Sequence, residues 1–154
     1  MKKFLSLALF AFSLSAFANP AGQFVGRYFV EGSESCRLGS EGDRAYIKLE
    51  TDEAGRRVLE INIFGGGARM DSFPVENTVA TSFSTGGHKI TDRTNVRWLS
   101  SSKMQVTTIT DAPTMGIRYS ISYGVALVEG GVKISEKHKG SGGENSTCVL
   151  VRTP

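Results

Sequence analysis

Apolar and polar residues alternate with a period of two along most of the chain, and this pattern predicts β-strands rather than helices. The segment 45–50 places Ala45, Ile47 and Leu49 on one face. The segment 56–64 returns after a short glycine-containing turn at 52–55, with Leu59, Ile61 and Ile63 on one face. Two alternating runs joined by such a turn are typical of a β-hairpin. We therefore expect the two segments to pair as antiparallel strands.

The longest alternating run covers residues 116–128. Its apolar side chains share one face, which includes two tyrosines: Ile117, Tyr119, Ile121, Tyr123, Val125 and Leu127. The intervening positions are polar or small, beginning with Arg118 and Ser120. Such alternation indicates an antiparallel strand with one buried face.

The remaining segments complete an all-β pattern. Further strands are expected at 24–31, 79–84, 89–91, 95–99, 103–110, 132–137 and 147–152, and an irregular stretch at 68–77. No internal repeat or interdomain linker interrupts them. Eight to ten strands joined mostly by short turns predict a single-domain, antiparallel up-and-down β-barrel, since closing a meander removes its exposed edges.

The N-terminus has a different pattern, with two lysines before an apolar run from Phe4 to Phe17 and the small-residue motif Ala16-Phe17-Ala18. These three parts together indicate a secretory signal peptide. The apolar run is shorter than the roughly 20 residues of a membrane-spanning helix, so no membrane anchor is expected. We expect residues 1–18 to be removed and residues 19–154 to form one domain in the periplasm or outside the cell.

The chain has two cysteines, Cys36 and Cys148, which follow the first predicted strand and begin the last one. In an exported protein such a pair most simply forms a disulfide, and two free thiols are the alternative. The bond would fasten the first strand to the last.

A resemblance arises at the same two strands. Gly26, Arg27 and Tyr28 on the first strand, with Arg152 at the end of the last, resemble the lipocalin-like (calycin) pattern. In that family a Gly-x-Trp motif packs under a basic residue from the end of the barrel, and Tyr28 stands here in place of the tryptophan. The resemblance implies a closed barrel with an internal ligand cavity, and it implies that Tyr28 meets Arg152.

Charge and motifs exclude several function classes. The net charge is +3, and it falls to +1 without Lys2 and Lys3, which gives no electrostatic reason to expect a nucleic acid or an anionic membrane as partner. His88 and His138 lack the spacing of metal ligands and are expected to be exposed loop residues. No serine lies in a Gly-x-Ser-x-Gly elbow, and no phosphate loop follows Gly65-Gly66-Gly67. We expect no enzymatic activity, no metal and no cofactor.

The apolar face of 116–128 is the main candidate for function. It is either part of a packed core or one wall of a ligand cavity, since small barrels can hold one small molecule. On the second interpretation the ligand-binding residues are Trp98, Tyr119, Ile121, Tyr123 and Val125. The protein would then be an exported, non-enzymatic binding protein for an apolar or amphipathic small molecule. The alternative is a protein-interaction module, such as a hydrolase inhibitor, that acts through glycine-rich loops at 32–43, 65–77 and 140–145.

Overall fold

The computed structural model describes residues 20–32, 36–65, 69–77 and 80–154. The predicted signal peptide lies outside these residues. The described part contains ten strands: β1 (Gly26–Glu31), β2 (Arg44–Thr51), β3 (Arg57–Phe64), β4 (Arg69–Pro74), β5 (Thr81–Thr85), β6 (His88–Ser100), β7 (Lys103–Ala112), β8 (Ile117–Val128), β9 (Gly131–Lys139) and β10 (Ser146–Arg152). Two short 3₁₀-helices, η1 (Pro20–Phe24) and η2 (Pro113–Met115), accompany them. No helix of these residues has the length and apolar character needed to cross a bilayer.

All ten strands form one antiparallel sheet in the order β4-β3-β2-β1-β10-β9-β8-β7-β6-β5. The predicted all-β, up-and-down arrangement is confirmed, including the hairpin of β2 and β3, in which Ile47 is opposite Ile61. Two details differ from the sequence analysis. The stretch expected to be irregular contains β4, and the two short strands expected at 89–91 and 95–99 are a single strand, β6.

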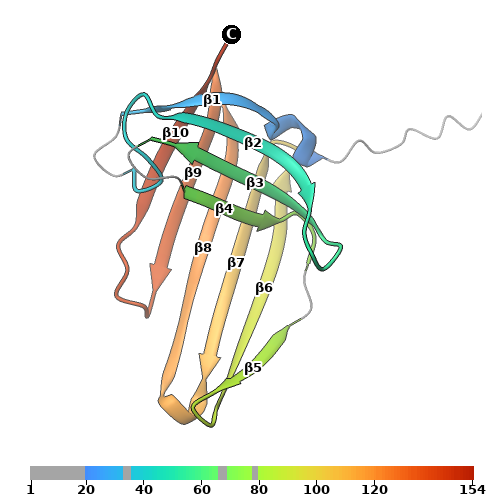
Figure 1. Cartoon of the computed structure of the whole chain (residues 1–154), viewed down its shortest axis with the longest axis vertical. Coiled ribbons are helices and arrows are strands. Elements are labelled where there is room, and N and C mark those ends of the chain that lie inside the picture. The colour runs from blue at the N-terminus through green and yellow to red at the C-terminus, as the bar shows by residue number, and fades with distance from the viewer. Residues whose placement is uncertain (1–19, 33–35, 66–68, 78–79) are drawn as a thin grey trace, which may run out of the picture.

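The predicted closure into a barrel does not occur, because no hydrogen-bonded ladder joins β4 to β5 among the described residues. The reason lies in the pairing of β5 with the start of β6, where Thr85 is opposite His88. This is the end of β6 that lies away from β4 (Figure 1). The C-terminal half of β6 lies beside the segment that follows β4, and two hydrogen bonds hold it there. The Trp98 indole N–H donates to the Val75 carbonyl at 3.1 Å, and the Val96 N–H donates to Asn77 Oδ1 at 2.9 Å.

The sheet curls so that β1–β4 lie across β6–β10, while β5 and the far ends of β6–β8 extend beyond β4 (Figure 1). The core fills the space between the two layers. Its largest fully buried side chains come from both: Phe24, Tyr28, Val30, Ile47, Leu59, Ile61, Ile63, Met104, Val125, Val132, Ile134 and Leu150. Each such side chain contributes about 1.5–3 kcal/mol when it is removed from water, so this layer contact is the main source of stability.

The junction of β1 and β10 joins the two halves of the sheet. Cys36 and Cys148 form the predicted disulfide across it. Tyr28 and Arg152 are register partners, as predicted, and the guanidinium carbon lies 5.3 Å from the ring centroid. Arg152 Nη2 donates to the Tyr28 hydroxyl at 2.9 Å, and that hydroxyl donates to the Phe24 carbonyl at 2.6 Å. A side chain larger than glycine at position 26 would crowd the Tyr28 ring, which is 3.3 Å from the position of a Cβ there.

Candidate functional site

Three of the five predicted ligand-binding residues belong to the packed space between the layers. Val125 is completely buried, opposite Met104 on β7 and Ile134 on β9. The Tyr123 ring packs on Phe73 with 4.8 Å between centroids, and its hydroxyl donates to Glu136 Oε1 at 3.1 Å. Trp98 is half-buried at the margin of the core and borders an open hollow of about 480 Å³ that also touches Val75 and Arg57.

The other two, Tyr119 and Ile121, lie on the inner side of β8 near its start, opposite Thr110 and Thr108 of β7. The start of β8 belongs to the part of the sheet that extends beyond β4 (Figure 1). Both are half-buried, and three other apolar side chains of this region, Met115, Ile117 and Phe83, are 45%, 38% and 50% exposed. The structure therefore places the five predicted residues in three settings: the core, its margin and the uncovered end of the sheet.

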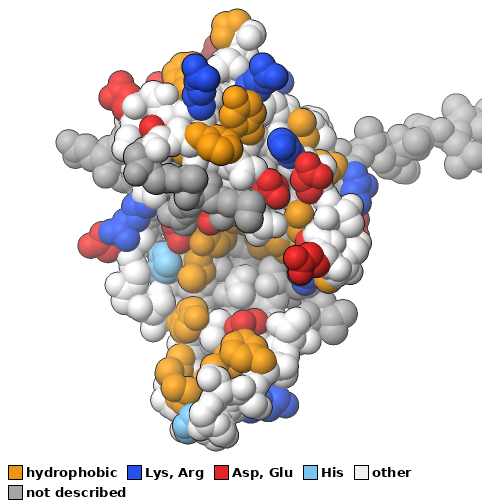
Figure 2. Space-filling model, viewed as in Figure 1, with side chains coloured by type: hydrophobic (Ala, Val, Ile, Leu, Met, Phe, Trp, Pro, Cys, Tyr) orange, Lys and Arg blue, Asp and Glu red, His pale blue; other side chains and the backbone are white. Residues whose placement is uncertain are grey.

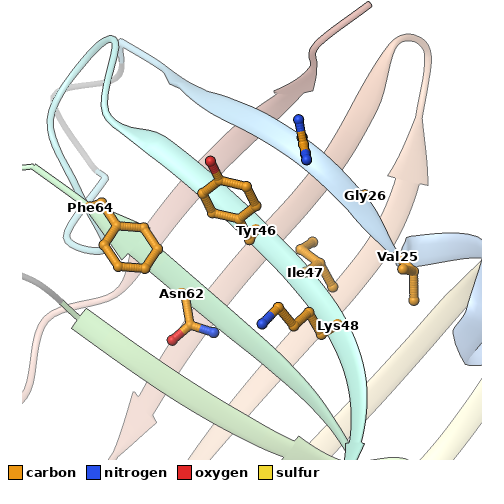
Figure 3. A pocket seen from close by; sticks show the side chains of 8 residues that line it. Val25, Gly26, Tyr46, Ile47, Lys48, Asn62 and Phe64 are labelled. Carbon is orange, nitrogen blue, oxygen red and sulfur yellow. The ribbon is translucent and has the colours of Figure 1, made fainter.

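A hollow of about 480 Å³ lies instead on the outer face of β1–β3 (Figure 3). We call it the aromatic groove and define it by Val25, Arg27, Tyr46, Lys48, Asn62 and Phe64. The rings of Tyr46 and Phe64 meet edge to face with 5.7 Å between centroids. Phe64 is 52% exposed and Val25 is 40% exposed, so apolar surface faces the solvent here.

The strand register explains how this groove forms. Arg27, Tyr46 and Asn62 are neighbours in one row across β1, β2 and β3, and their side chains point away from the core. Lys48 follows two residues after Tyr46, so it emerges on the same face. Figure 2 shows hydrophobic side chains gathered between Lys and Arg side chains on this upper part of the molecule. The arrangement can hold an apolar body against the rings and a negative group against the cations.

The sequence analysis missed this groove because it considered only the inner, apolar face of the hairpin. A signal was present. Residue 46 occupies the polar face of a cleanly alternating strand, yet it is a tyrosine, and Phe64 ends the next strand on the same face. Large exposed apolar groups that cluster on a surface indicate an interaction site more often than isolated ones do.

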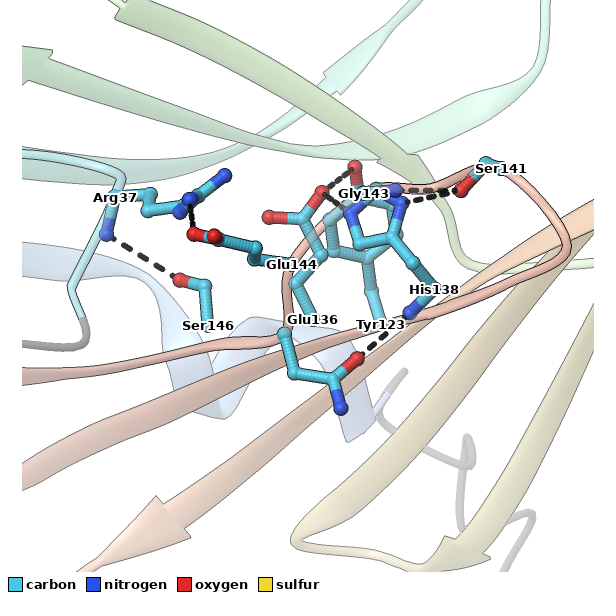
Figure 4. Close-up of polar contacts among 9 residues, drawn as sticks. Arg37, Tyr123, Glu136, His138, Ser141, Gly143, Glu144 and Ser146 are labelled. Atoms are coloured by element: carbon cyan, nitrogen blue, oxygen red, sulfur yellow. Dashed lines mark hydrogen bonds and ion pairs between the residues drawn. The ribbon is translucent and has the colours of Figure 1, made fainter.

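His138 is the centre of a polar network (Figure 4). Its Nε2 is 2.9 Å from Glu136 Oε1, which also accepts the Tyr123 hydroxyl, and its Nδ1 is 3.0 Å from Ser141 Oγ. Its backbone N–H donates to Asn145 Oδ1 at 2.9 Å. The prediction of exposed loop histidines is wrong for both residues. His138 lies in β9, and His88 begins β6 with its Nδ1 3.0 Å from Thr114 Oγ1.

The order serine, histidine, carboxylate is that of hydrolytic triads. A triad also needs N–H donors aimed at the position of the oxyanion. Here the Gly143 N–H donates to Ser141 Oγ itself at 3.4 Å. The glycine packs so closely on the His138 ring that a Cβ would collide with it. We therefore interpret the network as a brace that holds the loop 140–145 to β9, aided nearby by the ion pair of Arg37 and Glu144.

The outer side of β6–β9 is strongly basic. Within the bounds of these four strands it carries eight exposed lysine and arginine side chains: Lys89, Arg93, Arg97, Lys103, Arg118, Lys133, Lys137 and Lys139. Asp111 is the one acidic residue on that side of the four strands. We call this surface the basic face. None of its eight cations forms an ion pair within the part of the chain that the structure describes.

No group of three or more His, Cys, Asp or Glu side chains converges as a metal site among the described residues. One carboxylate has a shifted pKa. In the turn between β2 and β3, hydrogen bonds from the Arg56 side chain and backbone lower the pKa of Asp52, and burial opposes them weakly. Asp52 Oδ2 accepts the Arg56 Nε–H at 2.7 Å, so this pair fixes the turn.

Comparison with known proteins gives a limited result. No protein-family model matches the chain, and no curated protein matches its sequence. The described contact of Tyr28 with Arg152 agrees with the calycin-like pattern, but membership of that family is not confirmed. One similar solved structure is secretory abundant heat soluble protein 4 from Ramazzottius varieornatus, with 8% sequence identity and a TM-score of 0.43 over 89% of this chain and 97% of that chain.

Proposed function

We propose that the protein is an exported, non-enzymatic binding protein that holds a small amphipathic anion in the aromatic groove. The observation that carries this proposal is the exposed pair of Tyr46 and Phe64 in a hollow of about 480 Å³, a volume suited to a small molecule. The predicted internal site is less well supported, because Val125 and Met104, in the middle of the core, are completely buried.

The preference for an anion follows from the rim of the groove. Arg27 and Lys48 border it, and its remaining side chains are apolar or uncharged. One carboxylate, Glu60, is opposite Lys48 beside the groove and accepts a hydrogen bond from the Asn62 amide, so two cations face one acidic group. A ligand with an apolar or aromatic body would contact the two rings, and a carboxylate, sulfonate or phosphate would reach the cations. Aromatic contacts of this kind contribute about 0.5–1.5 kcal/mol each.

Anilinonaphthalene sulfonate is a suitable probe because it combines aromatic rings with one sulfonate. We expect it to bind with enhanced emission, and we expect Phe64→Ala to weaken binding about three- to tenfold. Phe83→Ala is the matched control, since Phe83 is 50% exposed and Phe64 is 52% exposed, on different parts of the molecule. Equal loss of binding in the two variants would contradict the proposal.

The charge requirement has a separate test. Lys48→Gln should weaken binding of the sulfonate probe and leave the binding of neutral N-phenylnaphthylamine unchanged. An internal site would give a different result, because a probe bound there would quench Trp98, which packs 6.2 Å from Phe24 at the margin of the core. Strong quenching of Trp98 with no effect of Phe64→Ala would contradict the aromatic groove and support a binding site in the interior.

A further inference from the structure

We propose that the basic face is a second binding surface and that its ligand is an acidic polysaccharide, lying along the strands. This inference goes beyond the proposed small-molecule function and does not depend on it. The two surfaces are formed by different strands, β1–β3 and β6–β9.

The cations stand mainly in two columns rather than in a single cluster. Arg93 and Arg97 belong to β6, and Lys137 and Lys139 belong to β9. Arg93, Ile109, Ser120 and Lys139 form one row across β6, β7, β8 and β9. Three strand spacings separate the columns, or about 14 Å, and the nine residues of β9 span about 30 Å. An extended chain with regularly spaced negative groups fits between such columns.

The floor between the columns consists mainly of small polar residues. Ser122 pairs with Thr107 on one side and with Lys137 on the other, and Gly124 lies between Gln105 and Ser135. A hollow of about 200 Å³ opens over Gly124 and a second, of about 400 Å³, lies beside Ser120 and Lys139. A Cβ at position 124 would approach Ser135 Oγ to 2.7 Å, so glycine at this position leaves the hollow open. Hydroxyl and amide side chains can exchange hydrogen bonds with sugar hydroxyls.

The chemistry of the face also separates a polysaccharide from other polyanions. The aromatic side chains of these strands, Trp98, Tyr119 and Tyr123, are on the inner side of the sheet. The face therefore offers no ring on which the bases of a single-stranded nucleic acid could stack. It also lacks the exposed aromatic side chains that anchor proteins at a lipid interface.

The net charge of the whole chain does not reveal this basic surface. The whole chain is close to neutral, at +3, because acidic residues are concentrated outside β6–β9. A local excess of unpaired cations attracts an anionic polymer even when the protein as a whole has little net charge.

The test measures binding of a labelled oligogalacturonate of defined length by fluorescence anisotropy at several salt concentrations. We expect binding that weakens steadily as salt rises, and none to a neutral dextran of equal length. The double variant Arg93→Gln/Lys139→Gln removes one cation from each column within a single row. It should reduce affinity about five- to thirtyfold and make the salt dependence less steep.

Arg44→Gln/Arg57→Gln is the matched control, because it removes two exposed arginines outside the basic face. It should leave oligogalacturonate binding unchanged. Far-ultraviolet circular dichroism and unfolding curves of both double variants establish that each is folded. A second variant, Gly124→Gln, adds no charge but fills the floor, and it should also weaken binding.

Three outcomes would overturn the inference: no binding of oligogalacturonate, equal loss in the two double variants, or tighter binding of single-stranded DNA or anionic phosphatidylglycerol vesicles than of oligogalacturonate. Binding of anilinonaphthalene sulfonate is measured on the Arg93→Gln/Lys139→Gln variant. Because Arg93 and Lys139 lie outside the aromatic groove, that binding should not change, so failure of one proposal is distinguishable from failure of the other.

Discussion

Replacing Tyr28 with phenylalanine removes one oxygen atom from the junction of β1 and β10, and we expect it to lower the free energy of unfolding by about 2 kcal/mol. Tyr28 is 1% exposed. Its hydroxyl donates to the Phe24 carbonyl at 2.6 Å and accepts from Arg152 Nη2 at 2.9 Å. The first bond is buried and contributes about 1 kcal/mol. The second has a charged donor, and hydrogen bonds of this kind contribute more to the free energy of unfolding than neutral ones do.

The loss of the second bond should be partial, because Arg152 keeps other acceptors. Its Nη2 also reaches the carbonyls of Gln23 and Val25, at 3.1 and 3.4 Å. This bond therefore adds about 1 kcal/mol rather than the larger values found for buried charged pairs. Arg152→Lys tests the same contact from the other side, since lysine keeps the charge and loses the planar fork. In a double-mutant cycle the two changes should couple by about 0.5–1.5 kcal/mol.

Urea unfolding followed by the fluorescence of Trp98, the one tryptophan, measures both effects. The midpoint should fall without a change in slope, because the surface exposed on unfolding is the same. Tyr46→Phe is the matched control: Tyr46 is on the outer face and makes no hydrogen bond through its hydroxyl within the described residues. Equal midpoints for Tyr28→Phe and Tyr46→Phe would refute the reasoning, and so would additive effects in the cycle.

Three further results follow from other parts of the fold. Thiol titration of the denatured, unreduced protein should detect no free cysteine, and Cys148→Ser should destabilise by about 2–5 kcal/mol; two reactive thiols would disprove the bond to Cys36. Val125→Phe should cost about 1–3 kcal/mol because its site is full, and unchanged stability would instead reveal empty space. The pKa of Asp52 is lowered by Arg56 in the folded state, so its stabilising effect is present above the unfolded pKa and is lost in acid. The stability difference from Asp52→Asn should shrink below about pH 4, and a difference that grows there would contradict this sign.

Most strands could be predicted from the sequence because the alternating pattern lies within each strand and turn residues bound it. The hairpin of β2 and β3 needs only alternation and a short turn, and the structure gives its expected register. The contact of Tyr28 with Arg152 was implied by the resemblance of the first and last strands to the calycin-like pattern, and the register of β1 and β10 confirms it. The segment of β4 was missed because the glycines before it and Pro74 within it suggest irregular structure.

The open sheet and the surfaces could not be predicted in the same way. The two-residue turn Gly86-Gly87 commits β5 to the start of β6, but the alternation within each strand does not show that this end of β6 lies away from β4. The basic face requires the register of four strands, because only the register shows that Arg93 and Lys139 stand in one row. The network of His138 depends on the path of a glycine-rich loop, since Ser141 reaches the ring only after the chain turns at Gly140.

The pairing of β1 with β10 has a consequence for the order in which the molecule can fold. Every other ladder of the sheet joins strands that are consecutive in the chain, so the two meanders β1–β4 and β5–β10 can form separately. The remaining ladder must bring together residues such as Tyr28 and Arg152, which are 124 positions apart, and the disulfide beside it joins Cys36 to Cys148 across 112 positions. A circular permutant that links the end of β10 to the start of β1 and opens the chain between β4 and β5 would make every ladder local. We expect this permutant to fold faster than the natural chain, because the distant ends no longer have to find each other.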